Sequence, residues 1–562
     1  MAVLVALVAP LSGGAANARV VVLHTNDTHT HIDDGRVAFS EIAAEKARLE
    51  AAGEHVILVD AGDYVQGTAL GGFDSGRSAI DIMNAAGYQV ATLGNHEFDY
   101  GIATMFANAG RAKFRTVSCN FLKRESAADP GRRVFPAYNV VTSGAVRVAF
   151  VGVTTPSTLV SAKPSTFLDP TGTWRAYDFI SGEALYAAVQ QAVNEAARAA
   201  DYTIVLGHLG ISPDCIGYRS TDVIAHTTNF VALIDGHSHS SMEGARVKNA
   251  AGREVILAQT GCYLGALGCL TLDDGACVAA STLFPARTKE PEVEWLETRL
   301  IGAVERQLGA RLAIVDSTLC SFAPGTGTRL ARSQGCAAGD FAADAYWWYA
   351  REKAGQRCDF ALVNGGNVRA DIPKGEVTLK TLRTVQPFGG GVGLVEVDGA
   401  TVLDALEFGA QVVGEGESGG FLHAAGLRYA IDARIPSSVK VSPSGAWKGG
   451  PIGARRVGHV QVYDGEKGEY VPLDPAKKYF VAGNSFTLIE GGDGFEMFKR
   501  ARPVSKKLET DYVALAEYAK AFEKGHNGVP RIASANAPLA KLKDYPVAYE
   551  KPEGSGRITI LK

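Results

Sequence analysis

The sequence lacks three features that would each assign it to a particular class of protein. No Cys-x-x-Cys pair occurs among its eight cysteines, which argues against a thiolate metal site or a thioredoxin-like centre. No apolar run approaches the roughly 18 residues that a membrane-spanning helix needs. Neither sign of charge dominates, because 56 Lys and Arg stand against 60 Asp and Glu, a formal net charge of −4. This balance argues against nucleic acid or an anionic membrane as the main partner.

The 64 glycines follow no fixed period, which excludes collagen-like and repeat architectures. What remains is an ordinary globular composition, with 46% hydrophobic and 21% charged residues. The C-terminal residues 556–562 form no hydrophobic tail, so we expect no membrane anchor. The sequence makes no prediction for the oligomeric state.

The N-terminus resembles a signal for export. Ala2 to Leu11 form an apolar run, and Ala16-Asn17-Ala18 has the pattern of a cleavage site. We therefore predict a signal peptide over residues 1–18, a mature chain beginning at Arg19, and a periplasmic or secreted location. Because a basic segment before the apolar run is missing, a buried N-terminal strand is the alternative.

The cysteines fit an oxidising compartment without requiring one. Cys262, Cys269 and Cys277 lie close together, and Cys320 and Cys336 flank a glycine-rich turn. Either group is compatible with a disulfide, and free buried thiols are the equal alternative.

Short apolar runs alternate with helical patterns in the first half of the chain. The runs are continuous and rich in β-branched residues, as in strands buried on both faces. They cover residues 20–23, 55–59, 89–93, 146–153, 203–206 and 231–234. Helical patterns over residues 39–52 and 78–86 are each followed by a glycine. Strands interleaved with helices predict a layered α/β domain.

A charged amphipathic helix is predicted over residues 290–308, where it would connect two domains. Beyond it, apolar runs at 360–363, 393–397 and 478–482 alternate with glycine-rich loops, which predicts a second α/β domain. We expect a catalytic domain over residues 19–289, a linker helix over 290–308 and a substrate-binding domain over 309–562.

Five of the predicted strands in the first half lead into side chains that bind metals. Because sites in open α/β sheets lie beyond the carboxyl ends of the strands, these loops are expected to converge. The candidate ligands are Asp27, His29, Asp63, Asn95, His208, His237 and His239. Ligands two residues apart, as in Asp27 and His29, face the same side of an extended segment.

Carboxylates and imidazoles without thiolates suit zinc, manganese or iron. Seven ligands are too many for one tetrahedral ion, but two four-ligand sets arise if Asp63 bridges. Two ions about 3.5–4 Å apart would suit an in-line phosphoryl displacement. His96 and Asp99, three residues apart after Asn95, are predicted neighbours in a helical turn. Asp99 would orient His96 and keep it protonated.

These motifs resemble the five signature motifs of the calcineurin-like metallophosphoesterases, and the pair Phe98-Asp99 resembles the 5′-nucleotidase branch. The resemblance implies a four-layer sandwich that binds two divalent ions, with zinc or manganese favoured. It implies one ion on Asp27, His29, Asp63 and His239, and the other on Asp63, Asn95, His208 and His237. His96 and Asp99 would be the catalytic pair.

Three turns in the second half offer groups that suit a nucleotide. They are the glycine-rich segment 364–369, which ends in a cation, the turn 387–390 with an aromatic residue, and the segment 491–495 with a carboxylate. Arginine pairs with phosphate in a bidentate fork, and aromatic rings stack on bases. A carboxylate accepts hydrogen bonds from ribose hydroxyls.

Together these turns resemble the C-terminal domain of 5′-nucleotidases. The resemblance implies Arg332 and Arg369 on phosphate or carboxylate groups, Asn364 on the base, Phe388 and Phe486 as a base clamp, and Asp493 on the ribose. Arg332 is assigned by its distance from Gly339. The segment between Phe486 and Gly491 is one residue longer than in the family pattern.

We therefore expect an exported dinuclear-metal phosphohydrolase that cleaves nucleoside 5′-monophosphates. Closure or rotation of the two domains would accompany turnover. A 2′,3′-cyclic nucleotide phosphodiesterase and a nucleotide-sugar or dinucleotide pyrophosphatase are the nearest alternatives. A sulfate-thiol hydrolase of sulfur oxidation and a non-catalytic nucleotide-binding protein are more distant. The expected partner is a nucleotide, not a nucleic acid polymer.

Overall fold

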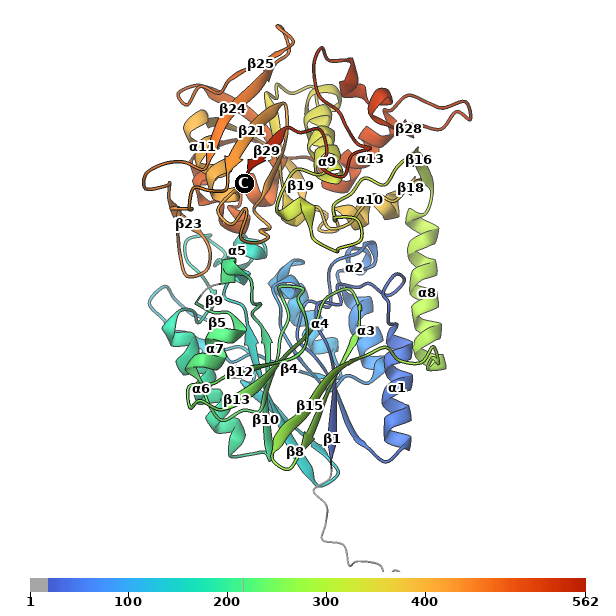
Figure 1. Ribbon diagram of the computed structural model, residues 1–562, viewed down its shortest axis with the longest axis vertical. Coiled ribbons are helices and arrows are strands. Elements are labelled where there is room, and N and C mark those ends of the chain that lie inside the picture. Colours follow the sequence, from blue (N-terminus) through green and yellow to red (C-terminus); the bar gives the residue numbers. More distant parts are fainter. Residues whose placement is uncertain (1–18, 216) are drawn as a thin grey trace, which may run out of the picture.

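The computed structural model describes residues 19–215 and 217–562 of the chain. The predicted signal peptide therefore lies outside the described residues. The first half contains two six-stranded sheets that face each other (Figure 1). One has the order β15 (Ala276–Leu283), β14 (Leu267–Asp273), β1 (Val20–Thr25), β2 (His55–Asp60), β3 (Val90–Thr92) and β4 (Arg115–Val117). The other has the order β12 (Ser241–Lys248), β13 (Glu254–Thr260), β11 (Ala232–Ile234), β10 (Tyr202–His208), β8 (Val146–Thr154) and β7 (Tyr138–Ser143).

Apolar residues on both faces of the strands explain the layered arrangement. In β1, Val20 and Val22 point into the core between the two sheets, whereas Val21 and Leu23 point into a core under helices. Helices α1 (Phe39–Ala51), α3 (Arg77–Ala86) and α8 (Pro291–Leu308) cover the first sheet, and α6 (Glu183–Ala197) and α7 (Ser220–His226) cover the second. The predicted four-layer sandwich is confirmed.

Helix α8 leads from the first half of the chain to the second (Figure 1). It begins after Glu290, whose side chain accepts a hydrogen bond from Val293 N at 3.0 Å, and Pro291 occupies its first turn. Val293, Val304 and Leu308 pack against the core under α1 and α3. The helix predicted from the amphipathic pattern is therefore present.

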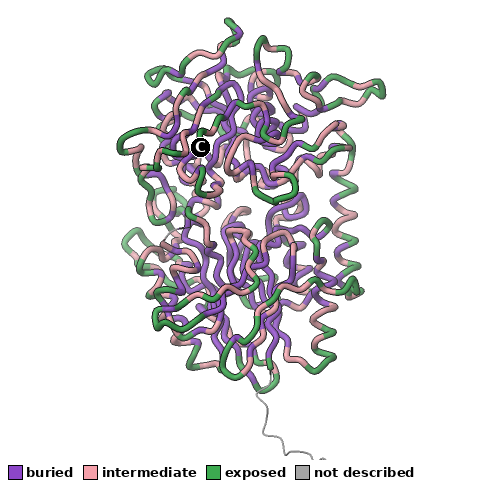
Figure 2. Tube along the Cα trace, viewed as in Figure 1, coloured by how far each residue is buried: buried purple, intermediate pink, exposed green. Residues whose placement is uncertain are grey.

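The second half is built around a five-stranded sheet with the order β20 (Leu422–Ala425), β17 (Phe360–Asn364), β26 (Lys478–Asn484), β19 (Gly391–Asp398) and β27 (Arg502–Thr510). Helices α9 (Ala337–Trp348), α10 (Leu379–Val385) and α13 (Asp511–Lys520) pack on one face. The other face packs against α11 (Gly399–Gly409) and a four-stranded sheet of β25 (Glu469–Pro472), β24 (Val457–Asp464), β21 (Leu427–Asp432) and β29 (Ile558–Leu561). Buried residues line the interior of both halves (Figure 2).

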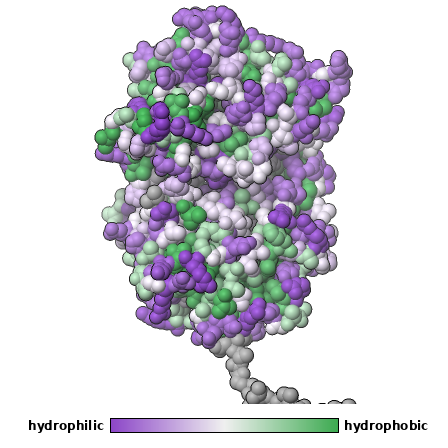
Figure 3. Space-filling model, in the orientation of Figure 1, coloured by the Kyte–Doolittle hydropathy of each residue, from purple (hydrophilic) through white to green (hydrophobic). Residues whose placement is uncertain are grey.

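The surface, the helices and the cysteines add three observations. On the face drawn in Figure 3, hydrophobic patches are small and are interrupted by hydrophilic side chains. None of the helices in residues 19–215 and 217–562 is long and apolar enough to cross a membrane. The cysteines in this part of the chain form no disulfide; Cys262 and Cys269 are partly exposed and the others are buried thiols.

A buried ion pair fastens the C-terminal strand β29 to the second half. The guanidinium of Arg557 donates to both carboxylate oxygens of Asp344, at 2.7 and 3.0 Å, and both side chains are fully buried. Tyr545 and Tyr549 donate their hydroxyls to the same carboxylate at 2.8 and 2.7 Å. All acceptor positions of this carboxylate are thereby used, which a buried charge requires.

Arg557→Leu should leave the Asp344 carboxylate buried without its counter-charge. We expect the free energy of unfolding to fall by about 3–5 kcal/mol, measured by urea denaturation. Arg246→Ala is the control, because Arg246 and Glu254 form an exposed pair at 3.1 Å that should contribute little. A variant as stable as the wild type would show that the pair does not hold the strand.

Candidate metal centre and adjoining nucleotide-binding loops

The seven predicted ligands converge at the carboxyl ends of strands from both sheets. Asp27, Asp63 and Asn95 follow β1, β2 and β3 of the first sheet, whereas His208 ends β10 and His237 follows β11 of the second. The site therefore lies where two facing sheets end, rather than at the edge of a single open sheet. Of these residues, Asp27, His29 and His208 are fully buried, whereas His237 and His239 are partly exposed.

The ligand loops are not extended, and this corrects the prediction for Asp27 and His29. Both residues have a positive φ of 48°, and Asp63, His237 and His239 have φ values of 63°, 75° and 57°. Such backbone is strained for residues other than glycine and persists where the surrounding structure enforces it. Gly94 allows the loop after β3 to lie close to Asp63, because a Cβ there would lie 2.2 Å from Asp63 Oδ1.

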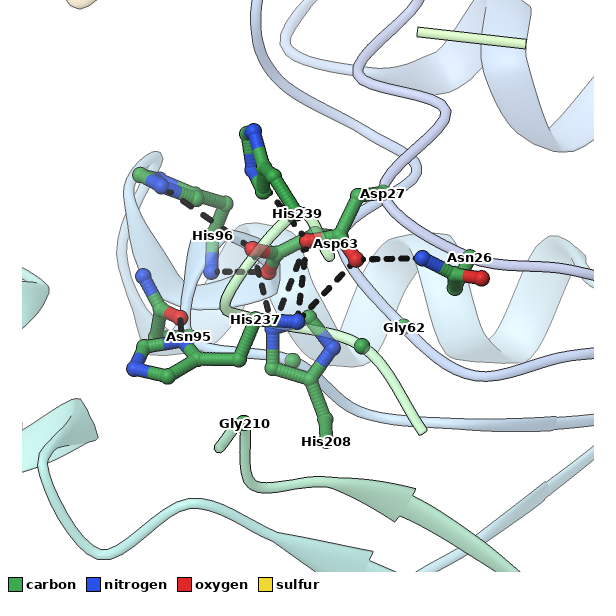
Figure 4. A network of polar contacts seen from close by, with 12 residues as sticks. Asn26, Asp27, Gly62, Asp63, Asn95, His96, His208, Gly210, His237 and His239 are labelled. Carbon is green, nitrogen blue, oxygen red and sulfur yellow. Dashed lines mark hydrogen bonds and ion pairs between the residues drawn. The ribbon is translucent and has the colours of Figure 1, made fainter. Parts of the chain in front are cut away.

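Asp63 lies at the centre of the cluster (Figure 4). Its Oδ2 is 3.0 Å from His208 Nε2, 3.8 Å from His29 Nε2 and 3.9 Å from His96 Nε2. Three groups have ligand atoms close enough to share an ion. The first is Asp27, His29 and His239, the second is Asp63, His208 and His237, and the third is His29, Asp63 and His96. Asn95 adjoins the second group through its Oδ1, 2.8 Å from His237 Nδ1.

The donor set fits divalent cations. His29 and His208 each direct Nδ1 at a backbone carbonyl, that of Gln66 or Ala61, at 2.7 Å. In the neutral rings the proton therefore lies on Nδ1, and the lone pair of Nε2 points at the carboxylates. A lone pair facing a carboxylate oxygen repels it unless a positive charge lies between them.

Without a metal, a proton on His208 supplies the positive charge between its Nε2 and the carboxylates. The charges of Asp63 and Asp27 outweigh the burial that lowers the pKa of His208, and raise it to about 10. Burial, followed by the positive charge of His208, lowers the pKa of His237 to about 3. Burial raises the pKa of Asp27 to about 7. The cluster therefore holds protons that a metal ion would displace.

His96 and Asp99 form the predicted pair. The short helix η1 (His96–Phe98) brings His96 Nδ1 to 2.6 Å from Asp99 Oδ2. Burial lowers the pKa of His96, but the charges of Asp99 and Asp63 outweigh it and the net shift is upward. The imidazolium form is thereby favoured beside Asp63, with Nε2 directed at the cluster.

Sequence reasoning missed the residues that hold the ligand loops. Glu97 accepts hydrogen bonds from the backbone N–H groups of Asp63 at 2.9 Å and Gly94 at 2.6 Å. Asn26 donates to Asp27 Oδ2 at 2.7 Å, and Asp235 accepts from Leu209 N at 2.9 Å. All three stand within two residues of a predicted ligand in the sequence, and that proximity was the available signal.

The second half brings arginines to the same cluster. Arg369 Nη2 lies 3.3 Å from His29 Nε2. Burial, together with the charges of Arg329 and Arg369, lowers the pKa of Arg332 to about 9. Arg329 was not predicted, although it stands only three residues before Arg332. Its Nη1 is 3.4 Å from His239 Nδ1, and its Nε donates to Glu417 at 2.5 Å.

The remaining predicted residues lie in the adjoining loops. Asn364 Nδ2 donates to Asp493 Oδ2 at 2.7 Å, and burial raises the pKa of Asp493 to about 6. The ring of Phe388 is 5.6 Å from that of His96, and its centre is 6.0 Å from the guanidinium carbon of Arg369. Phe486 packs against Gly492, where a Cβ would lie 2.2 Å from the ring.

A four-layer sandwich with a buried cluster of carboxylates and imidazoles at its strand ends defines the class as a metallophosphoesterase. The model of the calcineurin-like phosphoesterase family matches residues 20–241, and that of the 5′-nucleotidase C-terminal domain matches residues 318–500.

A snake venom 5′-nucleotidase from Crotalus adamanteus is 27% identical over 563 residues, which are 92% of this chain and 88% of that protein. The crystal structure of a 5′-nucleotidase precursor from Thermus thermophilus is 27% identical, with a TM-score of 0.74 over 97% of this chain and 99% of that one. A sulfate thiohydrolase from Thermus thermophilus, 17% identical, shares the fold with a TM-score of 0.68 over 98% of each chain.

The first half of the chain thus matches the calcineurin-like phosphoesterase model and the second half the 5′-nucleotidase C-terminal model, and the chain is similar to 5′-nucleotidases over nearly its whole length. It is accordingly a metal-dependent phosphoester hydrolase.

Metal binding should strengthen as the pH rises. Because His208 in the metal-free site holds a proton below about pH 10, a metal must displace that proton. We expect affinity for Mn²⁺ or Zn²⁺ to rise about tenfold per pH unit between pH 7 and 9, and more steeply below pH 7, where Asp27 is also protonated. Competition with a chromophoric chelator measures this, and an affinity independent of pH would contradict it.

Proposed function

We propose that the chain is an exported dinuclear phosphohydrolase that cleaves nucleoside 5′-monophosphates to nucleoside and phosphate. The observation that carries the proposal is the contact between the two halves at the cluster. Arg369 of the second half lies 3.3 Å from His29, and Phe388 lies beside His96. A phosphate at the cluster would therefore meet a cation, with an aromatic ring and the Asn364–Asp493 pair in the adjoining loops.

The proposed division of the chain is a catalytic domain over residues 19–289, a linker over 290–308 and a nucleotide-binding domain over 309–562, after a signal peptide over 1–18. In the catalytic domain, Asp27, His29, Asp63 and His239 would hold one ion, and Asp63, Asn95, His208 and His237 the other. Zinc or manganese suits this set of nitrogen and oxygen ligands. Two divalent ions, when bound, would supply the positive charge that polarises the ester and activates water.

The residues of the chain would bind the substrate and transfer a proton. Arg332 and Arg369 would bind the phosphate, and Asn364 and Asp493 the base and the ribose. In the reaction water attacks phosphorus and the bond from phosphorus to O5′ breaks. His96, kept protonated by Asp99, would donate its Nε2 proton to the departing O5′. Phe388 and Phe486 would clamp the base.

The substrate preference is testable by chromatographic analysis of the products formed from AMP, UDP-glucose, 2′,3′-cyclic AMP and p-nitrophenyl phosphate after chelation and metal add-back. We expect AMP to be preferred, Asp63→Asn to be inactive, and His96→Ala to lose about 10²- to 10⁴-fold in kcat, because it removes the proton donor. His226→Ala, a change at an exposed histidine, is the control. Preference for the cyclic or pyrophosphate substrate would replace the monophosphatase assignment.

Closure of the two domains is proposed to accompany turnover. Polar contacts cross between the halves on two sides, where Lys380 Nζ donates to Asp33 at 2.7 Å and Ser165 Oγ donates to Glu490 at 2.8 Å. Glu490 lies in the segment that is one residue longer than the family pattern. Such exposed contacts are weak enough to break in each cycle.

A cross-link should therefore slow the enzyme. A short bismaleimide joining Ser165→Cys and Glu490→Cys should cut kcat for AMP at least about tenfold, because substrate entry or product release would be blocked. Each single variant, treated identically, controls for reaction at the native cysteines. Unchanged turnover in the cross-linked protein would argue against closure.

A further inference from the structure

The proposed mechanism leaves unused a buried phenol in the core of the second half. Tyr346 lies on α9 and is fully buried, and burial raises its pKa well above the usual value. It packs in the core formed by α9, α10, α13 and one face of the five-stranded sheet. A buried hydroxyl normally has a hydrogen-bond partner, and this one has three.

The three partners use the full capacity of the hydroxyl. Tyr346 donates to Gln386 Oε1 at 3.0 Å and accepts from Asn367 Nδ2 at 3.3 Å. The side-chain amide of Asn484 donates to the same oxygen, while its Oδ1 accepts from Phe486 N at 2.9 Å. A phenol offers one donor and two acceptor positions, so all three are occupied.

Each partner belongs to a different substrate loop and stands two residues before a side chain that faces the nucleotide in the proposed function. Asn367 precedes Arg369, Gln386 precedes Phe388, and Asn484 precedes Phe486. The three partners are at most 3% exposed, so water does not compete for these bonds. One hydroxyl thus joins the phosphate loop to both aromatic loops.

Asp511, at the start of α13, extends the cluster on the side of the Phe388 turn. Its carboxylate accepts from Gly390 N at 3.1 Å and from Tyr512 N at 2.8 Å. The side chain of Asn367 also donates to it. Asn367 therefore uses both amide hydrogens, one on Tyr346 and one on Asp511, and the turn is held from two directions.

We propose that Tyr346 is a positioning residue whose hydroxyl sets the mutual geometry of the three loops that bind the nucleoside 5′-monophosphate. The inference rests on the proposed function. Without the hydroxyl, the Asn367 and Asn484 amides each lose an acceptor. Gln386 would lose its bond at Oε1, and its Nε2 already has no partner among the described residues. Buried amides without partners rearrange, and the loops that carry them would lose their common anchor.

Tyr346→Phe tests the proposal because it removes only the hydroxyl. We expect adenosine to bind about tenfold more weakly to the chelated, metal-free protein, measured by calorimetry. With metal restored, KM for AMP should rise by a similar factor. The value of kcat/KM for p-nitrophenyl phosphate, which has no nucleoside, should fall at least about threefold less than that for AMP.

Tyr518→Phe is the matched control. Tyr518 is fully buried in the same core, and its hydroxyl bonds to that of Tyr549 at 2.9 Å, away from the substrate loops. The Tyr518→Phe variant should have a lower melting temperature than the wild type and unchanged adenosine binding. If Tyr346→Phe does not fold, Gln386→Met removes one partner instead and should weaken adenosine binding about threefold.

Four outcomes decide whether Tyr346 positions the three loops. Weakened adenosine binding in Tyr346→Phe or Gln386→Met, but not in Tyr518→Phe, supports the proposal. Adenosine binding within twofold of the wild type in the variant that folds overturns it. Equal weakening by Tyr518→Phe also overturns it, because the effect would then be a general loosening of the core. Failure of the wild-type protein to bind adenosine would instead overturn the proposed function, and the inference with it.

Discussion

The structure depends on keeping the Asp63 carboxylate buried among imidazoles. A carboxylate withdrawn from water requires positive charge or hydrogen-bond donors around it. His208 lies 3.0 Å from Oδ2, and the backbone N–H of His96 donates to Oδ1 at 2.8 Å. The charge of His208 outweighs the burial that would raise the pKa of Asp63, and holds that pKa well below its usual range. The loops that supply these groups must therefore be fixed before any metal or substrate arrives.

Rigid surroundings allow the ligand loops to hold a strained backbone. Asp27, His29 and Asp63 have left-handed φ values, each unfavourable for a residue with a side chain. The strands that precede them are buried on both faces, so the cores above and below cannot shift to relieve the strain. Glu97 ties the loop after β2 to the loop after β3. The geometry of the site is thus maintained by the packing of two sheets.

The sequence predicted what depends on local pattern. Continuous apolar runs predicted β1 and β10, and polar residues directly after them are the candidate ligands. The pattern of strands alone did not distinguish one sheet from two, since a single open sheet also brings strand ends together, and the four-layer sandwich was predicted only through the family resemblance. The left-handed backbone at Asp27 depends on tertiary contacts. The Tyr346 hydroxyl could not be foreseen for the same reason, because its partners are 21, 40 and 138 residues away in the sequence.

Positive charge gathers where the two halves meet. The second half gathers Arg329, Arg332 and Arg369 at the contact, and Glu417 pairs with the first of them. Burial and the neighbouring guanidinium groups lower the pKa of Arg332 to about 9, a sign of cations held close together. Divalent ions in the first half would add further positive charge. A phosphate bound between the halves would relieve this repulsion, so substrate itself would stabilise the closed arrangement, and release of phosphate would favour its opening.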